Sequence, residues 1–430
     1  MTDQLLLGQT LRFSGHPFHN DWQSVTQHRR DGAVAIKDGK IVEVGTRDTL
    51  LASYPQADIT DHGQDLIVAG FVDAHVHYPQ TAIIASWGKR LIDWLNTYTF
   101  PEETRLSDPD YADKIAGTYL DTALTHGTTT MASYCTSSPV SVDAYFAAAR
   151  TRDMCVVGGK TCMDRNAPDG LIDTAKRAYD ESKAGIAKWH GNGRAVYAIT
   201  PRFSPTSTPE QLQALGDLWT EHPECLMQTH LSEQHEEIAW VQDLFPDARD
   251  YLDTYEKFGL LGTKGVYGHS IHLEPREVDR LAEVGAAVVH CPTSNTFIGS
   301  GLFDLMGLAK ARVTTGLATD IGGGSNFSML RTMAAAYEVA QLRGFALHPA
   351  QLMWLASEGS ASALHLSGRV GHLGIGADAD ICVIDMKSTA AIGQRVDNAS
   401  EFWEALFPTI MMGDDRAIRA VYVAGRKVGE

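Results

Sequence analysis

Short apolar runs recur along the middle of the chain, and each run ends in polar residues or glycine. The intervals between the runs leave room for one helix each time, so the pattern indicates repeated strand and helix units. The runs occupy residues 66–72, 128–134, 154–164, 194–203, 225–233, 265–272, 286–295 and 313–320. Eight such units predict an α/β fold built on a closed (β/α)8, TIM-like barrel.

One interval carries a clear helix signal. Residues 208–211 place a threonine, a proline and a glutamine at the cap, the first position and the third position of a helix. A doubly wound parallel sheet would show the same periodicity. The dinucleotide-binding pattern Gly-x-Gly-x-x-Gly does not follow the first run, however, and the glycines at 322–324 are typical of a loop. The barrel is therefore the favoured fold.

The two ends of the chain differ from the middle. Residues 33–44 predict a β-hairpin with a turn at Asp38-Gly39, and residues 380–384 and 420–428 are also typical of strands. We expect the ends to combine into one small β-sheet domain beside the barrel. The expected division is 1–68 for the N-terminal part of the small domain, 69–368 for the barrel and 369–430 for the C-terminal part.

Composition and charge narrow the range of partners. The 430 residues are 44% hydrophobic, which allows a large core. With 53 acidic against 36 basic residues, the formal charge is -17, and the basic residues form no cluster. This balance argues against nucleic acid or an anionic membrane as a partner and favours a small neutral substrate.

Cysteine usage and apolar content favour a cytoplasmic protein. The six cysteines are dispersed without a Cys-x-x-Cys pair, so we expect reduced, mostly buried thiols. Residues 1–4 do not begin a basic and then apolar leader, and no apolar stretch approaches the roughly 20 residues that span a bilayer. We therefore expect no membrane span.

The first apolar run leads into Asp73-Ala74-His75-Val76-His77. We expect residues 66–72 to form one buried strand, and residues i and i+2 of a strand point to the same side. His75 and His77 would then face one cavity and could bind one cation. Taken alone, an His-x-His pair is more often a chance feature of a surface strand, so the decision depends on the rest of the chain.

Polar or aromatic side chains end most of the predicted strands, on the barrel face where active sites lie. Those that end the later runs are Arg202, Phe203, His230, Glu233, His269, His290 and Asp320. Together with His75 and His77, residues His230 and Asp320 supply three imidazoles and one carboxylate, a set that suits a divalent ion such as zinc and leaves a position for water. Singly, each histidine could be a satisfied core residue, and Asp320 could merely end a strand or cap a helix. Their joint placement supports the prediction.

These motifs resemble the amidohydrolase superfamily, and within it the metal-dependent aminohydrolases that act on purines. The resemblance rests on residues 70–77, 228–233 and 319–320 and spans most of residues 65–345. Further similar segments are 77–80, 93–95, 98–102, 163–168, 200–203, 290–295 and 316–322. One departure concerns His269, which has glycine and serine beside it where alanine and cysteine are expected.

The resemblance implies one divalent metal per chain, zinc (Zn2+) or, as the alternative, iron (Fe2+). Its ligands would be His75, His77, His230 and Asp320. His269 would contact the water or the developing oxyanion. A bridged two-metal site is disfavoured, because residues 201–203 stand where two-metal relatives carry a carboxylated lysine, and Lys160 is then structural. A homodimer is expected on the same ground.

The implied reaction is hydrolytic deamination of a cyclic amidine, which converts guanine to xanthine and ammonia in purine catabolism or salvage. A water activated by the metal would attack the carbon that carries the amino group. Glu233 would carry protons to the ring nitrogen and the amine, Asp320 would accept the proton of the water, and His269 would assist. Without the resemblance, Glu233 is nearly as well explained as a first-turn helix carboxylate.

Recognition of the base is expected from Gln80, Arg202, Phe203 and Glu233. The guanidinium of Arg202 would donate to the O6 and N7 edge of guanine, an edge that adenine does not present. Arg202 could instead only pair with an acid at the barrel rim. The aromatic residues of the first loop would form a lid or simply pack against the barrel; they are Trp94, Tyr98 and Phe100.

Three other functions compete with this hypothesis. The same site could deaminate another aminated heterocycle, such as 8-oxoguanine, a pterin, cytosine or a triazine. A non-catalytic assembly protein is disfavoured, because every expected ligand is present. The unrelated zinc deaminases combine His-x-Glu with a later Pro-Cys-x-x-Cys, and residues 235–237 offer only the first half.

Overall fold

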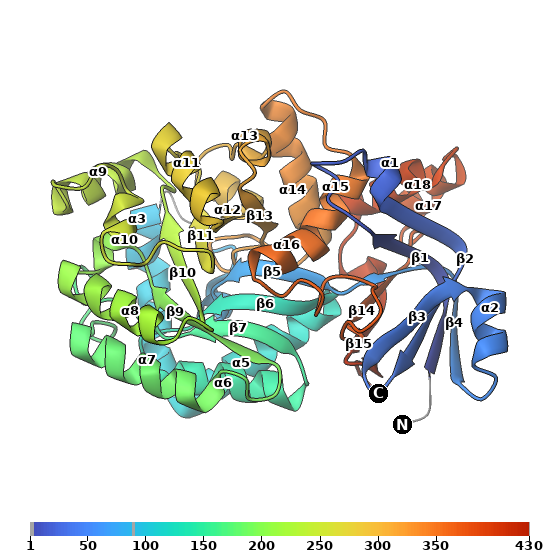
Figure 1. The fold of residues 1–430 in the computed structure, drawn as a ribbon, viewed down its shortest axis with the longest axis horizontal. Coiled ribbons are helices and arrows are strands. Elements are labelled where there is room, and N and C mark those ends of the chain that lie inside the picture. The colour runs from blue at the N-terminus through green and yellow to red at the C-terminus, as the bar shows by residue number, and fades with distance from the viewer. Residues whose placement is uncertain (1–3, 88–90, 430) are drawn as a thin grey trace.

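The central feature of the computed structural model, which describes residues 4–87 and 91–429, is a barrel of parallel strands (Figure 1). Within the described residues its strands follow one another in chain order around the barrel. All but the first lie within one of the predicted runs, and the first begins at the end of its run. The strands are β5 (Phe71–Val76), β6 (Thr128–Tyr134), β7 (Cys155–Gly159), β9 (Ala195–Pro201), β10 (Leu226–Leu231), β11 (Gly265–His269), β12 (Ala287–His290) and β13 (Thr314–Leu317). The short β8 (Thr161–Cys162) also pairs with β9. The predicted barrel is confirmed.

Residues just beyond the last strand close the barrel against the first. The backbone N–H of Asp320 donates to the carbonyl of His75 at 3.0 Å. One carboxylate oxygen of Asp73 accepts from the backbone N–H of Thr319 at 3.0 Å, and the other accepts from the Thr319 hydroxyl. The closure therefore joins two of the segments that carry predicted site residues.

Helices cover the outside of the barrel (Figure 1). The longer ones are α5 (Pro109–Thr125), α6 (Pro139–Thr151), α7 (Ala175–Trp189), α8 (Pro209–Glu221), α9 (His235–Leu244), α11 (Pro275–Val284) and α14 (Met329–Leu342). The shorter helical segments are α1 (Trp22–Val25), α2 (Arg47–Ser53), η1 (Tyr78–Ile83), α3 (Leu91–Trp94), η2 (Leu95–Thr99), α4 (Phe100–Thr104), η3 (Arg105–Ser107), η4 (Ser204–Thr206), α10 (Asp253–Glu256), α12 (Pro292–Phe297), α13 (Leu305–Lys310), α15 (Pro349–Trp354), η5 (Leu355–Gly359), α16 (Ser360–Ala363) and η6 (Asp415–Ala417). The predicted cap of α8 is present, because Thr208 Oγ1 accepts from the N–H of Gln211 at 3.2 Å.

A second sheet, built from both ends of the chain, stands beside the barrel (Figure 1). Its strands are β1 (Gln4–Phe13), β2 (Thr26–Lys37), β3 (Lys40–Thr46), β4 (Asp58–Ala69), β14 (Ile381–Ile384), β15 (Ile418–Val423) and β16 (Arg426–Lys427). Their order is β16-β15-β14-β4-β1-β2-β3, so β4 and β14 join the two ends. Asp38 and Gly39 take positive φ angles in the turn between β2 and β3, as the predicted hairpin requires.

The prediction of one strand over residues 66–72 is wrong. Leu66–Ala69 ends β4 in the small sheet, whereas Phe71 begins β5 in the barrel. Gly70 lies between the two sheets, and its N–H donates to the carbonyl of Asp380 at 2.8 Å. A Cβ at Gly70 would lie 2.2 Å from Thr129 Oγ1, so the crossing requires glycine. The sequence pattern hides this change of sheet because the end of β4 and the start of β5 are both apolar.

The C-terminal part is not made of strands alone. Two helices, α17 (Ala390–Asp397) and α18 (Phe402–Met412), lie between β14 and β15. Helix α18 packs against α14 of the barrel, where the rings of Phe407 and Tyr337 meet edge to face at 5.0 Å. The chain end therefore contributes both to the small sheet and to the outer layer of the barrel.

Two further observations concern the cysteines and the possibility of a membrane span. All six cysteines are buried free thiols, as predicted. Within residues 4–87 and 91–429, no helix combines the length and the apolar character needed to cross a bilayer.

Candidate active site

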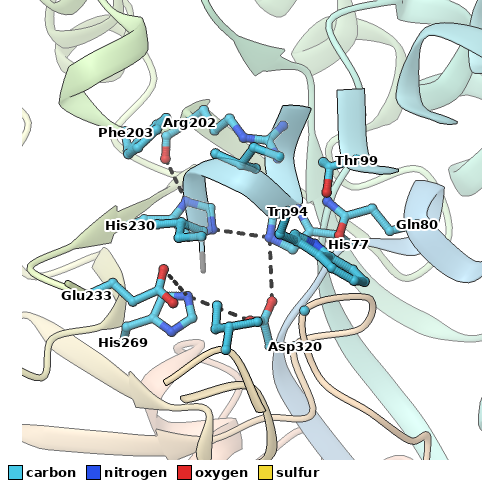
Figure 2. Close-up of a pocket in the computed structure, with 14 residues that line it drawn as sticks. His77, Gln80, Trp94, Thr99, Arg202, Phe203, His230, Glu233, His269 and Asp320 are labelled. Atoms are coloured by element: carbon cyan, nitrogen blue, oxygen red, sulfur yellow. Dashed lines mark hydrogen bonds and ion pairs between the residues drawn. The ribbon is translucent and has the colours of Figure 1, made fainter. Parts of the chain in front are cut away.

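A pocket opens at the carboxyl ends of the barrel strands (Figure 2). Its lining comes from loops that follow different strands: His77, Gln80, Leu91, Trp94, Leu95, Thr99, Arg202, Phe203, His230, Glu233, His269, Ile298, Asp320 and Gly323. The predicted site residues are therefore brought together here, apart from His75, whose ring packs beside those of His77 and His230 at centroid distances of 5.3 and 4.8 Å.

Three imidazoles converge beside the pocket. His77 Nε2 and His230 Nε2 are 3.1 Å apart. His230 Nδ1 lies 2.7 Å from the carbonyl oxygen of Arg202, which can only accept, so Nδ1 carries the proton and Nε2 presents its lone pair. Burial, followed by the neighbouring histidines, lowers the pKa of His75, His77 and His230 well below the usual value. Neutral rings of this kind are suited to bind a cation.

Asp320 adds a carboxylate to the same cluster. Its Oδ1 lies 3.5 Å from His75 Nε2 and 3.6 Å from His77 Nε2. Burial raises the pKa of Asp320 to about 7. His75 Nε2 is buried and has no hydrogen-bond partner among the described residues. An unsatisfied imidazole nitrogen beside a carboxylate and two further imidazoles fits a divalent metal ion.

Cys291 lies in the same region but differs in chemistry. Its thiol is within 4.8 Å of possible ligand atoms of His75, His269 and Asp320. Burial raises the pKa of Cys291 well above its ordinary value, which disfavours the thiolate form. Because the thiolate is the form that binds metals, the histidine and aspartate group is the better ligand set.

Glu233 faces this cluster from the loop after β10. Ser300 Oγ donates to Glu233 Oε1 at 2.7 Å, and Glu233 Oε2 lies 3.5 Å from His269 Nε2. Burial raises the pKa of Glu233 to about 7. Helix α9 begins at His235, so Glu233 precedes the helix and does not belong to its first turn. Its carboxyl group is placed to exchange protons near neutral pH.

His269 lies between the two carboxyl groups in Figure 2. Its Nδ1 is 2.9 Å from Asn295 Oδ1, and its Nε2 is 3.7 Å from Asp320 Oδ2. His290, which ends the neighbouring strand, does not reach the pocket. Its ring instead stacks on Phe303 with centroids 4.4 Å apart, which agrees with a core histidine.

On the other side of the pocket, Gln80 and Arg202 share one buried acid. Gln80 Nε2 donates to Glu103 Oε1 at 2.8 Å, and Arg202 Nη1 donates to Glu103 Oε2 at 2.7 Å. Phe203 follows Arg202 and lines the same wall. Arg202 thus does pair with an acid, as the alternative interpretation held, but inside the pocket wall and not at an exposed rim.

The first loop supplies part of this wall. Trp94 lines the pocket and is buried, and the Arg202 guanidinium lies 5.5 Å from the centre of the Phe100 ring. Tyr98 packs on Trp94 at 5.2 Å between ring centroids. These contacts agree with packing of an ordinary loop, and closure as a lid stays a prediction.

Three residues around the site were missed by the sequence analysis. Glu103 is an acid in the first turn of α4, a position with no special signal, and Ser300 lies in a loop without a motif. Asn295 belongs to the segment 290–295, which was noted for its resemblance, but no role was assigned to it.

A barrel with histidines and carboxylates at the carboxyl ends of its strands defines a class of hydrolytic barrel enzymes that can use a bound metal. The model of the amidohydrolase family matches residues 66–428, so the chain belongs to this family. The chain is 43% identical over 401 residues to the guanine deaminase of Escherichia coli (strain K12), which covers 93% of this chain and 91% of that protein.

The chain is also similar to solved structures of guanine deaminases. The structure of E. coli guanine deaminase matches with a TM-score of 0.97 and 41% identity, over 99% of each chain. A guanine deaminase from C. acetobutylicum, with guanine bound in its active site, matches with a TM-score of 0.90 and 27% identity, over 99% of this chain and 100% of that one.

Proposed function

We propose that this protein is a hydrolytic deaminase of guanine, forming xanthine and ammonia. The observation that supports it best is that Gln80 and Arg202, which we propose to bind the purine, line the same pocket as the carboxyl groups of Glu233 and Asp320. The similarity to guanine deaminases over most of the chain supports the same substrate.

The proposed metal ligands are His75, His77, His230 and Asp320. When bound, a divalent ion in such a site supplies Lewis acidity, which lowers the pKa of a water toward about 7. Zinc is the proposed ion and ferrous iron the alternative, since imidazole and carboxylate suit both. Chelation should abolish turnover, and metal analysis of the restored enzyme should give one ion per chain.

The chain's own carboxyl groups carry the protons. Burial raises the pKa of Glu233 to about 7, so its carboxyl group can hold a proton near neutral pH and donate it to the ring nitrogen next to the reacting carbon. Asp320 accepts the proton of the attacking water. His269 lies between the two and hydrogen-bonds the oxygen that becomes the new carbonyl. Glu233, now ionised, takes the proton of the new hydroxyl group and delivers it to the leaving amine as the C–N bond breaks. The proton held by Asp320 then restores the protonated form of Glu233.

We propose that the residues of the opposite pocket wall select guanine over other bases. Arg202 presents a planar set of donors that matches the O6 and N7 acceptors, while adenine offers a donor at the O6 position. Gln80 adds an amide that can hydrogen-bond the base, and Phe203 supplies an aromatic surface.

The deciding experiment measures ammonia release by purified protein of known metal content. Guanine should be converted at neutral pH, while adenine, cytosine, 8-oxoguanine and a pterin should not. Conversion of another heterocycle with guanine inert would keep the mechanism and refute the substrate. We also propose a homodimer in the cytoplasm, which light scattering and cell fractionation test.

A further inference from the structure

Glu103 links two loops that come from different parts of the barrel. Gln80 lies in η1 after β5, and Arg202 follows β9, yet both donate to the same carboxylate in α4. The Glu103 side chain is completely buried, with an exposed fraction of 0%, against 3% for Arg202. A buried ion pair costs desolvation energy, which points to a role beyond stability.

The contact with Glu103 fixes the orientation of the Gln80 amide, that is, the directions in which its Nε2 and Oε1 atoms point. A carboxylate only accepts hydrogen bonds, so it must face the Nε2 end of the amide. The opposite end is held as well, since Gln80 Oε1 accepts from the N–H of Gly322 at 3.3 Å. The amide therefore cannot flip without losing both contacts.

The same carboxylate orients the guanidinium of Arg202. It holds Nη1 at 2.7 Å, and the Phe100 ring lies on the guanidinium at 5.5 Å. A guanidinium is planar, so one anchored nitrogen together with one covered face sets the direction of its other donors. Glu103 thereby couples the orientation of Arg202 to that of Gln80.

We propose that Glu103 is a positioning residue for substrate specificity: it aligns Gln80 and Arg202 into one donor edge that recognises purines with a 6-keto group. The inference rests on the proposed function. The contacts involve the edge of the base that does not react, so they act alike in the ground state and the transition state. Such uniform binding appears in KM and much less in kcat.

The test compares Glu103→Gln with Glu102→Gln. Glu102 is the neighbouring buried acid of α4, and it pairs outward with Arg105 at 2.9 Å and with Tyr111, away from the pocket. Glutamine keeps the shape of either side chain. For each variant, kcat and KM for guanine are measured, with the inhibition constants of hypoxanthine, which has the 6-keto group, and of unsubstituted purine, which lacks it.

In Glu103→Gln, KM and the hypoxanthine inhibition constant should each rise about tenfold or more, the loss expected for a charge-assisted hydrogen bond. The inhibition constant of purine should change less than about twofold, as should all constants of Glu102→Gln. Equal weakening of both inhibitors, or unchanged constants in a folded Glu103→Gln protein, would overturn the inference. Failure of the wild-type protein to convert guanine would instead refute the proposed function.

A double-mutant cycle checks that Glu103 acts through Arg202. In an Arg202→Met background the further change Glu103→Gln should raise KM by a smaller factor than in the wild-type background, because only Gln80 is left for Glu103 to orient. A full additional loss would contradict the inference. If Glu103→Gln does not fold, Glu103→Asp, which keeps the charge but shortens its reach, takes its place with the same expected ranking of the two inhibitors.

Discussion

Glu233 Oε2 and His269 Nε2 lie 3.5 Å apart, although the two residues follow different strands. In the ladder between β10 and β11, Leu231 is paired with His269 itself, and Glu233 stands two residues further along. The register of one strand pair therefore sets the distance between a proton carrier and its neighbouring imidazole.

Replacement of Glu233 by Gln should abolish turnover and leave the metal content unchanged. The amide keeps the shape but cannot transfer a proton, and general acid-base catalysis contributes roughly 100- to 10,000-fold. Ammonia release and elemental analysis measure the two quantities. Glu236→Gln, in the exposed first turn of α9, serves as the control and should retain full activity. Near-normal turnover in Glu233→Gln would end this assignment.

Ser300→Ala should move the alkaline limb of the kcat/KM profile to higher pH. The Ser300 hydroxyl stabilises the ionised form of Glu233 and so lowers its pKa, which burial raises to about 7. Activity that needs protonated Glu233 is lost as pH rises through this pKa. Without the hydroxyl the pKa rises further, and activity persists to higher pH.

The matched control for this pH profile is Ser232→Ala. Ser232 is buried in the same loop as Glu233, and its hydroxyl has no hydrogen-bond partner in the part of the chain that the structure describes. Its profile should coincide with that of the wild type. A shift of the Ser300→Ala limb toward lower pH would contradict the proton-donor role.

Arg194→Met should destabilise the protein strongly. Arg194 precedes β9, and its guanidinium binds Asp378 and Asp380 of the C-terminal part with only 10% of the side chain exposed. Asp378 keeps Lys40 and Arg369 as partners, but the buried Asp380 loses its ion-pair partner, which costs about 3–5 kcal/mol. Urea unfolding measures the loss. Arg416→Met, which breaks an exposed pair with Asp414, should cost less than about 1 kcal/mol.

Gly70→Ala tests the crossing between the sheets. The added Cβ would lie 2.2 Å from Thr129 Oγ1 and 2.6 Å from its methyl carbon, and overpacking of this kind costs about 1–3 kcal/mol. Thermal unfolding should show a lower midpoint. Gly117→Ala in α5, where the nearest atom to the new Cβ would be 3.7 Å away, should raise the midpoint or leave it unchanged. Equal midpoints for both variants would show that Thr129 moves aside freely.

The sequence predicted the barrel because its strands are short, apolar and ended by polar residues. His230 and His269 illustrate why the predicted residues lie together: parallel strands end on one face, so residues distant in the chain meet there. The change of sheet at Gly70 escaped notice, since the apolar pattern continues through it.

Glu103 could not be predicted in the same way. An acid near the start of a helix is favoured by the helix dipole alone, so its presence carries no functional signal. Its role depends on contacts with Gln80 and Arg202, which approach it only once the barrel has closed. Ser300 likewise gains its partner Glu233 from another loop. Such contacts have no periodicity that a single sequence displays.

The pairing of β4 with β14 constrains how the chain is made. Residues 66–69 of β4 leave the ribosome long before residues 381–384 of β14, the strand that pairs with them. Throughout synthesis of the barrel, the N-terminal strands therefore present an open edge, and open edges recruit strands from other chains. A nascent chain that stops before β14 contains every pocket residue but still exposes the edge of β4, and we expect it to aggregate. Pairing of β14 with β4 covers this edge and so protects the protein against self-association.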